Sequence, residues 1–335
     1  MRVLQSKYIE QDKYTAVTLG NFDGIHLGHQ KLISTVKEYA EKYGLKTIVF
    51  SFYPHPKSFF FGEDFYTIFT RYEKERLVEK MGVDELILYP FTAEFANMEP
   101  EDFAEYFFDR MKCKVLVVGD DYCFGKDRRG DYNLLKSIGD KKGVDVIKIS
   151  SINDNDIRIS STRIRECIKQ RDFKEAYKLL GKSYFVSGNV VGGKRIGRKI
   201  NFPTANIVTP NNKLLPPDGV YLTKTEHKGK IYNSITNVGK NPTVGGKHKT
   251  VETYIFDFEQ DIYGDEIIVR FYDFIRDECK FNSIDELKEQ ITKDKAKAVE
   301  LFRQEIWFYF YRYTEINGFC SRFKVYDAFW NWKHK

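Results

Sequence analysis

The first 52 residues alternate between buried strands and one amphipathic helix. Residues 15–22 form a short apolar run that ends at Gly-Asn. From 27 to 43 the apolar residues recur at helical spacing, and Gly44 supplies a C-terminal stop. Residues 46–52 are β-branched and aromatic, as in a second buried strand. Strand, helix and strand within 40 residues predict a βαβ unit with a parallel sheet.

The same alternation continues to about residue 155. A helix is expected to begin near Pro100, because proline suits a first helical turn. Residues 114–119 and 144–149 have the composition of further buried strands. Residues 1–155 are therefore predicted to form a doubly wound α/β domain, followed by a helix around 164–180.

After about residue 181 the pattern changes to short strands and turns. Ser283, with Glu286 three residues later, predicts the start of a helix that runs through about 302. Before it, short alternating runs separated by turn residues predict a small antiparallel barrel. These runs are 219–225, 230–238, 251–258 and 266–271. The predicted fold class is thus α/β plus β, with a domain boundary near 181–184.

Composition agrees with two folded domains and leaves the ligand class open. The chain has 335 residues, and roughly 150 residues per domain suggest two domains. With 42% hydrophobic residues it can bury a core, which excludes wholesale disorder. The net charge of +6 is mild among 30% charged residues. It fits phosphorylated small molecules as well as nucleic acid.

The N-terminal residues and the cysteines point to a cytoplasmic protein. No secretory signal and no apolar stretch of about 20 residues is found, so no membrane association is expected. The five cysteines are odd in number and include no CxxC pair. This argues against a disulfide framework and a structural zinc site.

Two histidines mark the first candidate site. His26 and His29 lie between the first strand and the helix, three residues apart, and so share one helical face. The helix N-terminus adds unpaired N–H groups and partial positive charge, while Gly24 and Gly28 allow close approach of phosphates. Together they predict a site that stabilises charge on a transferring phosphoryl group. Alternatives are two surface histidines on a helix cap or a zinc site, which lacks a third ligand here.

This H-x-G-H string resembles the nucleotidylyltransferase superfamily, and NFDGIHLGHQ resembles the bacterial bifunctional riboflavin kinase/FMN adenylyltransferases, or FAD synthetases. Matches to that family follow in order at 51–56 (SFYPHP), 119–125 (GDDYCFG, with Tyr122 for the usual Phe), 129–131 (RGD) and 159–165 (ISSTRIR). The resemblance implies a Rossmann-like adenylyltransferase domain.

The resemblance also implies which residues of that domain bind its ligands. ATP and its phosphates are assigned to Gly20, Asn21, Phe22, Asp23, Gly24, Gly28, Ser161, Thr162 and Arg165, and the flavin to Pro54, His55, Pro56, Asp121 and Phe124. Independently, Ser161 and Thr162 suit a helix cap that holds a phosphate, and Arg165 adds a forked cation. A plain N-cap with solvated arginines is the alternative. Phe59, Phe60 and Phe61 either wall a flat ring system or belong to the core.

A glycine-rich basic loop marks the second candidate site. It is neither a Walker A sequence nor a GxGxxG fingerprint, yet such a loop can wrap phosphates through N–H groups and cations. A basic β-hairpin is equally compatible with it. The candidate phosphate-binding residues are Gly188, Gly193, Lys194, Arg195, Gly197 and Arg198.

The segments that follow this loop resemble riboflavin kinase. They are 201–207 (NFPTANI, with Asn201 where the family usually has Gly), 216–221 (PPDGVY), 237–243 (NVGKNPT, followed by Val244 where Phe is common) and 251–258 (VETYIFDF). The resemblance implies that Thr204 and Asn206 hold Mg²⁺ with the nucleotide and that Glu252 is the base for the riboflavin 5′-hydroxyl. Neutral oxygens suit such a Mg²⁺. The alternatives are an Asn-capped turn and a solvated strand residue.

The last 33 residues extend past the family's usual end. Residues 303–335 hold twelve aromatic residues, including all three tryptophans, and Trp307, Phe310 and Tyr311 have helical spacing. They predict either an added helix packed on the fold or an interface for a homo-oligomer. The predicted domains are therefore 1–182 (adenylyltransferase), 183–302 (riboflavin kinase-like barrel with a helix) and 303–335 (extension).

The predicted function is bifunctional: riboflavin and ATP give FMN, and FMN and a second ATP give FAD and pyrophosphate, with Mg²⁺ as cofactor. A nucleotidylyltransferase for another acceptor, with the barrel as a binding module, is one alternative. A nucleic-acid-binding protein is the other. The cations cluster in loops beside phosphate-type motifs rather than along strands, so no nucleic acid is expected as a partner.

Overall fold

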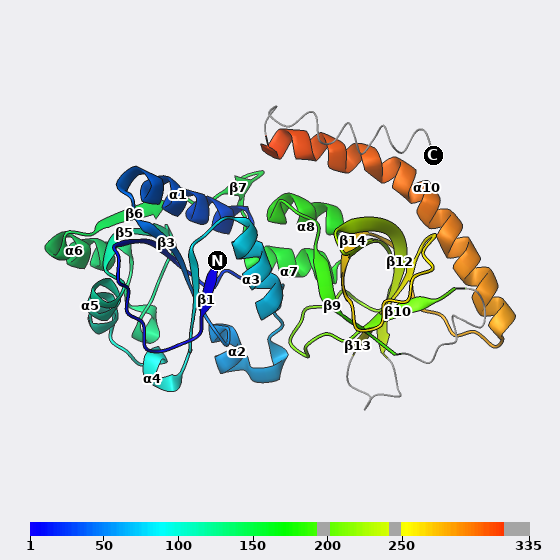
Figure 1. Ribbon diagram of the computed structural model, residues 1–335, viewed down its shortest axis with the longest axis horizontal. Coiled ribbons are helices and arrows are strands. Elements are labelled where there is room, and N and C mark those ends of the chain that lie inside the picture. Colours follow the sequence, from blue (N-terminus) through cyan, green and yellow to red (C-terminus); the bar gives the residue numbers. More distant parts are fainter. Residues whose placement is uncertain (193–201, 241–248, 318–335) are drawn as a thin grey trace. The chain divides into compact units, whose positions relative to one another are not determined.

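The chain forms two compact units, each built from two separate stretches of the sequence. A computed structural model describes residues 1–192, 202–240 and 249–317, with only the backbone for 304–317. The first unit comprises Met1–Gln170 together with Thr209–Pro216. The second comprises Arg171–Val208 and the chain from Pro217 onward. Each unit is described by itself (Figure 1).

The first unit is built on a six-stranded, all-parallel sheet, which confirms the predicted sheet type. The strand order is β1-β4-β3-β2-β5-β6. The strands are β1 (Arg2–Leu4), β2 (Thr15–Leu19), β3 (Lys46–Phe52), β4 (Glu85–Tyr89), β5 (Cys113–Gly119) and β6 (Asp145–Ile149). The order reverses between β2 and β5. In such sheets ligands bind outside the carboxyl ends of the strands at this point.

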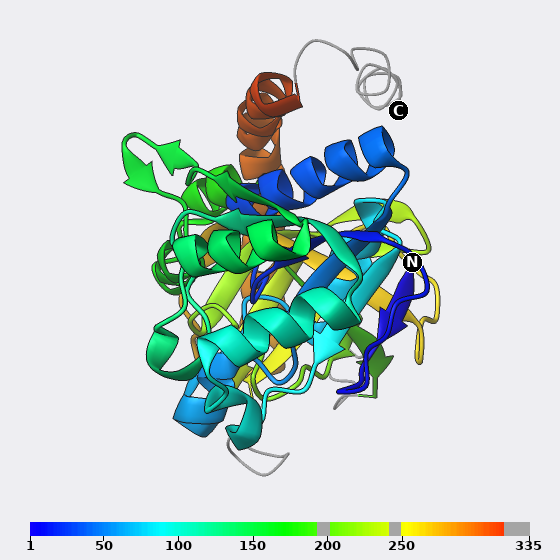
Figure 2. The ribbon, with the colours of Figure 1, turned by 90° about the vertical axis from the view of Figure 1, so that its left-hand side faces the viewer.

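Helices cover both faces of this sheet (Figure 2). Alternate residues of β2 face opposite sides: Ala16 packs with α1, and Val17 packs in the cluster that holds α5 and α6. The helices of the unit are α1 (Leu27–Tyr43), α2 (Pro56–Phe61), α3 (Arg71–Lys80), α4 (Ala93–Ala96), α5 (Pro100–Arg110), α6 (Tyr132–Lys142) and α7 (Ser161–Lys169). Short 3-10 turns at Gly62–Asp64 and Lys126–Arg128 and a small hairpin of β7 (Asn153–Asp154) and β8 (Ile157–Arg158) complete it.

The helix predicted around 164–180 is in fact two helices. α7 ends at Lys169, and α8 (Phe173–Leu180) begins after Asp172, whose side chain accepts a hydrogen bond from Glu175 N–H. Arg171 between them has a φ of 65°, a left-handed conformation that cannot continue a helix. The ring of Phe173 contacts Tyr221 and Phe271, so α8 belongs to the second unit. By contacts the second unit therefore begins earlier than the predicted boundary near 182.

The second unit is the predicted closed antiparallel barrel. Its strands run in the order β10-β13-β12-β11-β14-β9. They are β9 (Phe185–Val191), β10 (Thr204–Ile207), β11 (Gly219–His227), β12 (Lys230–Lys240), β13 (Lys249–Ile255) and β14 (Glu266–Arg276). Val251, Thr253 and Ile255 point into the barrel, while Glu252 between them is only half-buried.

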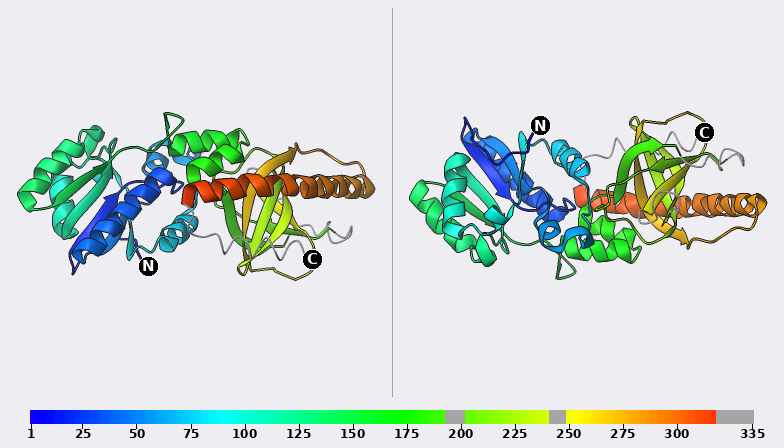
Figure 3. Two further views of the ribbon diagram at one scale, coloured as in Figure 1. Left: turned by 90° about the horizontal axis from the view of Figure 1, so that it is seen from above. Right: turned by 90° about the horizontal axis from the view of Figure 1, so that it is seen from below.

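A long helix passes along the barrel (Figure 3). α10 (Ile284–Asn317) is capped by the predicted hydrogen bond from Glu286 N–H to Ser283 Oγ. Ala298 and Phe302 pack against the β-strand residues Val220 and Ile235. The helix was predicted to end at about 302, but its backbone continues to Asn317. The side chains of Trp307, Phe310 and Tyr311, and all of 318–335, lie outside the described residues.

Gly188 lies where the barrel leaves no room for a side chain. A Cβ on this residue would lie 2.3 Å from Ile207 Cγ2 and 3.0 Å from Val208 O, because the end of β10 packs closely on β9, with which it pairs. We expect Gly188→Ala to lower the free energy of unfolding by about 1–3 kcal/mol through overpacking, measured as a shift in the urea midpoint. Gly192→Ala is the matched control, since a Cβ there meets nothing within 4 Å. Equal midpoints for the two variants would contradict this account.

Candidate active sites

A cavity of about 910 Å³ lies at the carboxyl ends of β2 and β5 in the first unit. This is the reversal point of the strand order, where the fold predicts ligand binding. Twelve of the sequence-predicted site residues line it. They are Gly20, Asn21, His26, Gly28, His29, His55, Pro56, Asp121, Phe124, Ser161, Thr162 and Arg165.

The two histidines lie together at the start of α1. His26 is the N-cap residue, and its Nδ1 accepts the His29 N–H at 3.4 Å. The two rings stack with centroids 3.6 Å apart, and the ring of Phe22 packs on His29 from another side at 5.1 Å. A Cβ on Gly28 would lie 3.1 Å from the His26 ring, so the glycine makes room for it. The arrangement fixes two imidazoles beside the positive end of a helix dipole.

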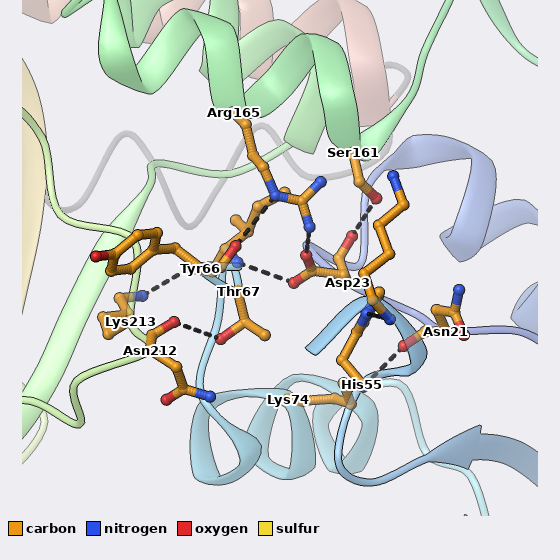
Figure 4. Close-up of polar contacts among 12 residues, drawn as sticks. Asn21, Asp23, His55, Tyr66, Thr67, Lys74, Ser161, Arg165, Asn212 and Lys213 are labelled. Carbon is orange, nitrogen blue, oxygen red and sulfur yellow. Dashed lines mark hydrogen bonds and ion pairs between the residues drawn. The ribbon is translucent and has the colours of Figure 1, made fainter. Parts of the chain in front are cut away.

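Arg165 of α7 is held at the cavity by an acidic partner. It forms an ion pair with Asp23, and its Nε donates to Tyr66 O at 3.2 Å (Figure 4). Ser161 Oγ donates to Asp23 O at 2.7 Å. The pair neutralises a carboxylate that would otherwise repel a phosphate. Ser160, not Ser161 or Thr162, caps α7, because its side chain accepts from Arg163 N–H.

Four predicted residues support the cavity rather than line it. Phe22 and Asp23 are buried, with 0% and 2% exposure. Gly24 has a φ of 89° and forms the turn that leads to α1. Pro54 is exposed and precedes α2. None of these four residues therefore lines the cavity itself.

Lys74 is a buried cation that sequence reasoning missed. It lies on the first turn of α3 and donates to Asn21 O at 2.7 Å and to Ser51 Oγ at 3.1 Å (Figure 4). Burial lowers the pKa of Lys74 to about 8, while the charge of Asp23 opposes that shift. No motif marks this lysine, because only the packing of α3 beside the ends of β2 and β3 brings it to Asn21, which lines the cavity.

His55 is a buried imidazole at the start of α2. It caps α2, accepting from Lys57 N–H at 3.0 Å, and stacks on Phe65 with ring centroids 4.6 Å apart. Burial, together with the charges of Lys74, Arg165 and Lys57, lowers the pKa of His55 to about 3. It therefore offers hydrogen bonding and a ring face to a ligand, not a positive charge.

We expect the His55 imidazole to stay unprotonated at pH 5, where an ordinary histidine with a pKa near 6.5 is charged. Below pH 6.5 the unfolded chain binds a proton at this residue and the folded chain does not. The contribution of the unprotonated His55 to the free energy of unfolding is thus complete above pH 6.5 and is lost as the pH falls towards 3. NMR titration of the imidazole tests this, with the signal assigned by its absence in His55→Gln. A midpoint near pH 6.5 would contradict it.

Aromatic side chains form one wall of the cavity. Phe59, Phe60 and Phe61 are exposed and line it, and the rings of Phe59 and Phe60 contact Phe91 at 5.6 and 5.9 Å. Of the two readings that the sequence allowed for these three residues, the structure favours the wall, since none lies in the core. Such exposed rings suit a flat aromatic ligand.

The second candidate site is a row of polar side chains across three barrel strands. Asn206 of β10 is directly opposite Glu252 of β13, which is in turn opposite Asn237 of β12. Opposed residues in antiparallel strands share a face, with Cβ atoms about 4.5–5.5 Å apart. Thr204 lies two residues from Asn206 and so points to the same side. The row therefore brings one carboxylate between two amides.

A second carboxylate, Glu278, approaches this row. Asn237 Nδ2 donates to Glu278 Oε1 at 2.9 Å, and a Cβ on Gly239 would collide with the same carboxylate. Sequence reasoning missed Glu278, which follows β14 outside every motif. Gly188, predicted to bind phosphate, lies within β9, where its lack of a side chain allows Ile207 and Val208 to approach closely. Gly193, Lys194, Arg195, Gly197, Arg198 and the motif residues 201 and 241–243 lie outside the described residues.

Comparison with known proteins assigns the two units. Residues 8–163 match the FAD synthetase family model, and residues 180–302 match the riboflavin kinase model. A bifunctional riboflavin kinase/FMN adenylyltransferase from Bacillus subtilis is 37% identical over 299 residues, 88% of this chain and 94% of that protein. The chain belongs to this bifunctional family. The Escherichia coli member is 36% identical over 289 residues, 85% of this chain and 92% of its own.

A solved structure has the same fold as this riboflavin kinase/FMN adenylyltransferase family member. It is described as a macrolide-efflux protein from Streptococcus pneumoniae, is 37% identical, and superposes with a TM-score of 0.80 over 88% of this chain and 98% of that chain. No helix in the described ranges is long and apolar enough to span a membrane. Since both matched domains are enzymatic, the chain carries both activities, and the barrel is not merely a binding module.

Proposed function

We propose that FMN is adenylylated in the cavity of the first unit and that riboflavin is phosphorylated at the Asn206–Glu252–Asn237 row of the second. The observation that carries the first assignment is the stacked pair His26 and His29 at a helix N-terminus inside that cavity. The second assignment is supported by the register that sets Glu252 between two amides.

In the cavity, an FMN phosphate oxygen attacks the α-phosphorus of ATP, and pyrophosphate leaves. The attacking oxygen is already deprotonated, so this step needs charge stabilisation more than a base. His26, His29 and the α1 N-terminus face the phosphates, and Ser161, Thr162 and Arg165 lie at the same cavity. The phenylalanine wall offers a surface for the isoalloxazine ring.

At the barrel, the riboflavin 5′-oxygen attacks the γ-phosphorus of ATP and ADP leaves. Phosphoryl transfer depends on positioning and charge stabilisation, with one carboxylate accepting the hydroxyl proton. Glu252 is the residue proposed for that task, and Asn206 and Asn237 flank it. Glu278 orients Asn237 through their hydrogen bond.

We propose Mg²⁺ as the metal that accompanies ATP. Thr204 and Asn206 present hard, neutral oxygens on one side of β10, which fits an ion that keeps waters and phosphate ligands. Among the described residues, no group of three or more His, Cys, Asp or Glu side chains could hold a metal. When bound, Mg²⁺ neutralises charge on the transferring phosphate.

The test is a single assay with two readouts. The purified chain is incubated with ATP, Mg²⁺ and either riboflavin or FMN, and the flavins are separated. FMN formed from riboflavin reports the barrel site, and FAD formed from supplied FMN reports the cavity. Variants at each site then show whether the two activities separate as the assignment requires.

We also propose a cytoplasmic location and self-association for this chain. The four cysteines in the described ranges, Cys113, Cys123, Cys167 and Cys279, are free thiols, as in reducing compartments. The aromatic composition of 303–335 suits an interface between copies of the chain. Deleting 303–335 tests this proposal by sedimentation: loss of assembly with both activities intact supports it.

A further inference from the structure

A short segment from the kinase half of the sequence belongs to the adenylyltransferase unit. Thr209–Pro216 follows β10 and precedes β11 along the chain, yet its contacts place it in the first unit. Thr67 N–H donates to Asn212 O at 2.7 Å, and Leu214 N–H donates to Thr67 O at 2.8 Å. These bonds join the segment to 66–70 as a short parallel bridge (Figure 4).

The segment carries a fully buried ion pair. Lys213 Nζ lies 2.8 Å from Glu73 Oε2 and donates to Ile68 O at 2.7 Å, and both charged side chains are 0% exposed. Glu73 in turn accepts the Thr70 N–H at 2.7 Å at the start of α3. Burial lowers the pKa of Lys213, and the Glu73 carboxylate opposes that shift. A buried pair is poor evidence for stability but fixes geometry, because either charge alone is costly there.

The segment 66–70 also contacts Asp23 and the cavity-lining Arg165. Ile68 N–H donates to Asp23 Oδ1 at 2.9 Å, and Tyr66 O accepts from Arg165 Nε. Asp23 is the ion-pair partner of Arg165. Phe65, which directly precedes Tyr66, stacks its ring under the Arg165 guanidinium, with Cζ 4.6 Å from the ring centroid. The stretch next to Lys213 is thus the stretch that orients Arg165.

A second route runs through α3. Glu73, which Lys213 anchors, is adjacent to Lys74, and Lys74 donates to Asn21 O in the cavity lining. Loss of the Lys213 ammonium therefore releases two supports of the same site. Both supports act on residues proposed to bind ATP and its phosphates, not on the phenylalanine wall.

We propose that Lys213 is a positioning residue for adenylyl transfer: with Ile68 and Glu73 it holds 66–70 and the start of α3, and through them Asp23, Arg165 and Asn21. A segment encoded between two strands of the kinase barrel thereby completes the adenylyltransferase site. The inference rests on the proposed location of that reaction in the cavity.

The decisive variant is Lys213→Met in the full chain, which keeps the length of the side chain and removes its charge. We expect kcat/KM for ATP in FAD formation to fall about tenfold or more, through a raised KM for ATP, while KM for FMN changes less than twofold. FMN formation from riboflavin in the same preparation should stay within twofold. A purely structural role would lower the amount of active enzyme and leave both KM values unchanged.

Two further variants keep the test decisive. Lys213→Met with Glu73→Gln also removes the buried negative charge that Lys213 neutralises, so it should fold even if the single variant does not, and should still show the raised KM for ATP. Lys136→Met is the matched control, because its ion pair with Asp140 is exposed on α6. A parent-like KM for ATP in the double variant would overturn the proposal. If His29→Ala also leaves FAD formation unchanged, the cavity assignment itself fails.

Discussion

Glu252→Gln is expected to lower FMN formation from riboflavin by about 10²- to 10⁴-fold, the usual contribution of a positioned general base. The amide keeps the volume of the side chain and its position between Asn206 and Asn237, but it cannot accept the hydroxyl proton. The loss should appear in kcat, since the proton moves in the transition state and the ground-state contacts survive. Separation of the flavins after incubation with riboflavin and ATP measures it.

The same variant supplies its own internal control. FAD formed from supplied FMN should equal that of the parent, because the cavity of the first unit does not include Glu252. Glu259→Gln removes an exposed carboxylate seven residues later and should alter neither product. If Glu252→Gln makes FMN within a few-fold of the parent rate, the residue is not the base, and Glu278 becomes the carboxylate to replace next.

His29→Ala is expected to lower FAD formation by about 10²- to 10³-fold, as when one preorganised donor to developing charge is removed. His29 is the better test of the pair, because His26 also caps α1 and its loss would cost helix stability. The variant removes a donor that is held by stacking on His26 and Phe22. The rate of FAD formation at saturating FMN and ATP measures the effect.

Lys31→Ala is the matched control for this prediction. It removes an exposed side chain two residues further along the same helix and should leave FAD formation unchanged. FMN formation from riboflavin should be equal in the parent and both variants, since the barrel is untouched. Equal FAD rates for His29→Ala and Lys31→Ala would mean that the histidine pair has no part in adenylyl transfer.

Local patterns predicted most of the elements but not all. The first βαβ unit, four of the six barrel strands (β11 to β14) and the start of α10 were found where periodicity and capping residues placed them. Most of β9 and all of β10 were not predicted as strands. β4 and α3 were missed, although α3 begins with a Thr70–Glu73 capping box. The break between α7 and α8 was also missed, because it depends on Arg171 adopting a left-handed conformation within an otherwise helical pattern.

The sequence by itself determined the chemistry that its local motifs encode. His26 and His29 lie at a helix N-terminus because a strand ending in glycine is followed by a helix that a histidine caps. Neighbours in sequence set this geometry, so it does not depend on distant parts of the chain. The same holds for the alternation that turns Glu252 away from the barrel interior.

Only the tertiary structure decided which distant residues meet. The register of three strands sets Glu252 between Asn206 and Asn237, and packing buries Lys74 and lowers the pKa of His55. It also carries Lys213 into the first unit, about 140 positions from its partner Glu73. Burial and long-range pairing depend on the whole fold, because desolvation is set by every element around a side chain and not by its sequence neighbours.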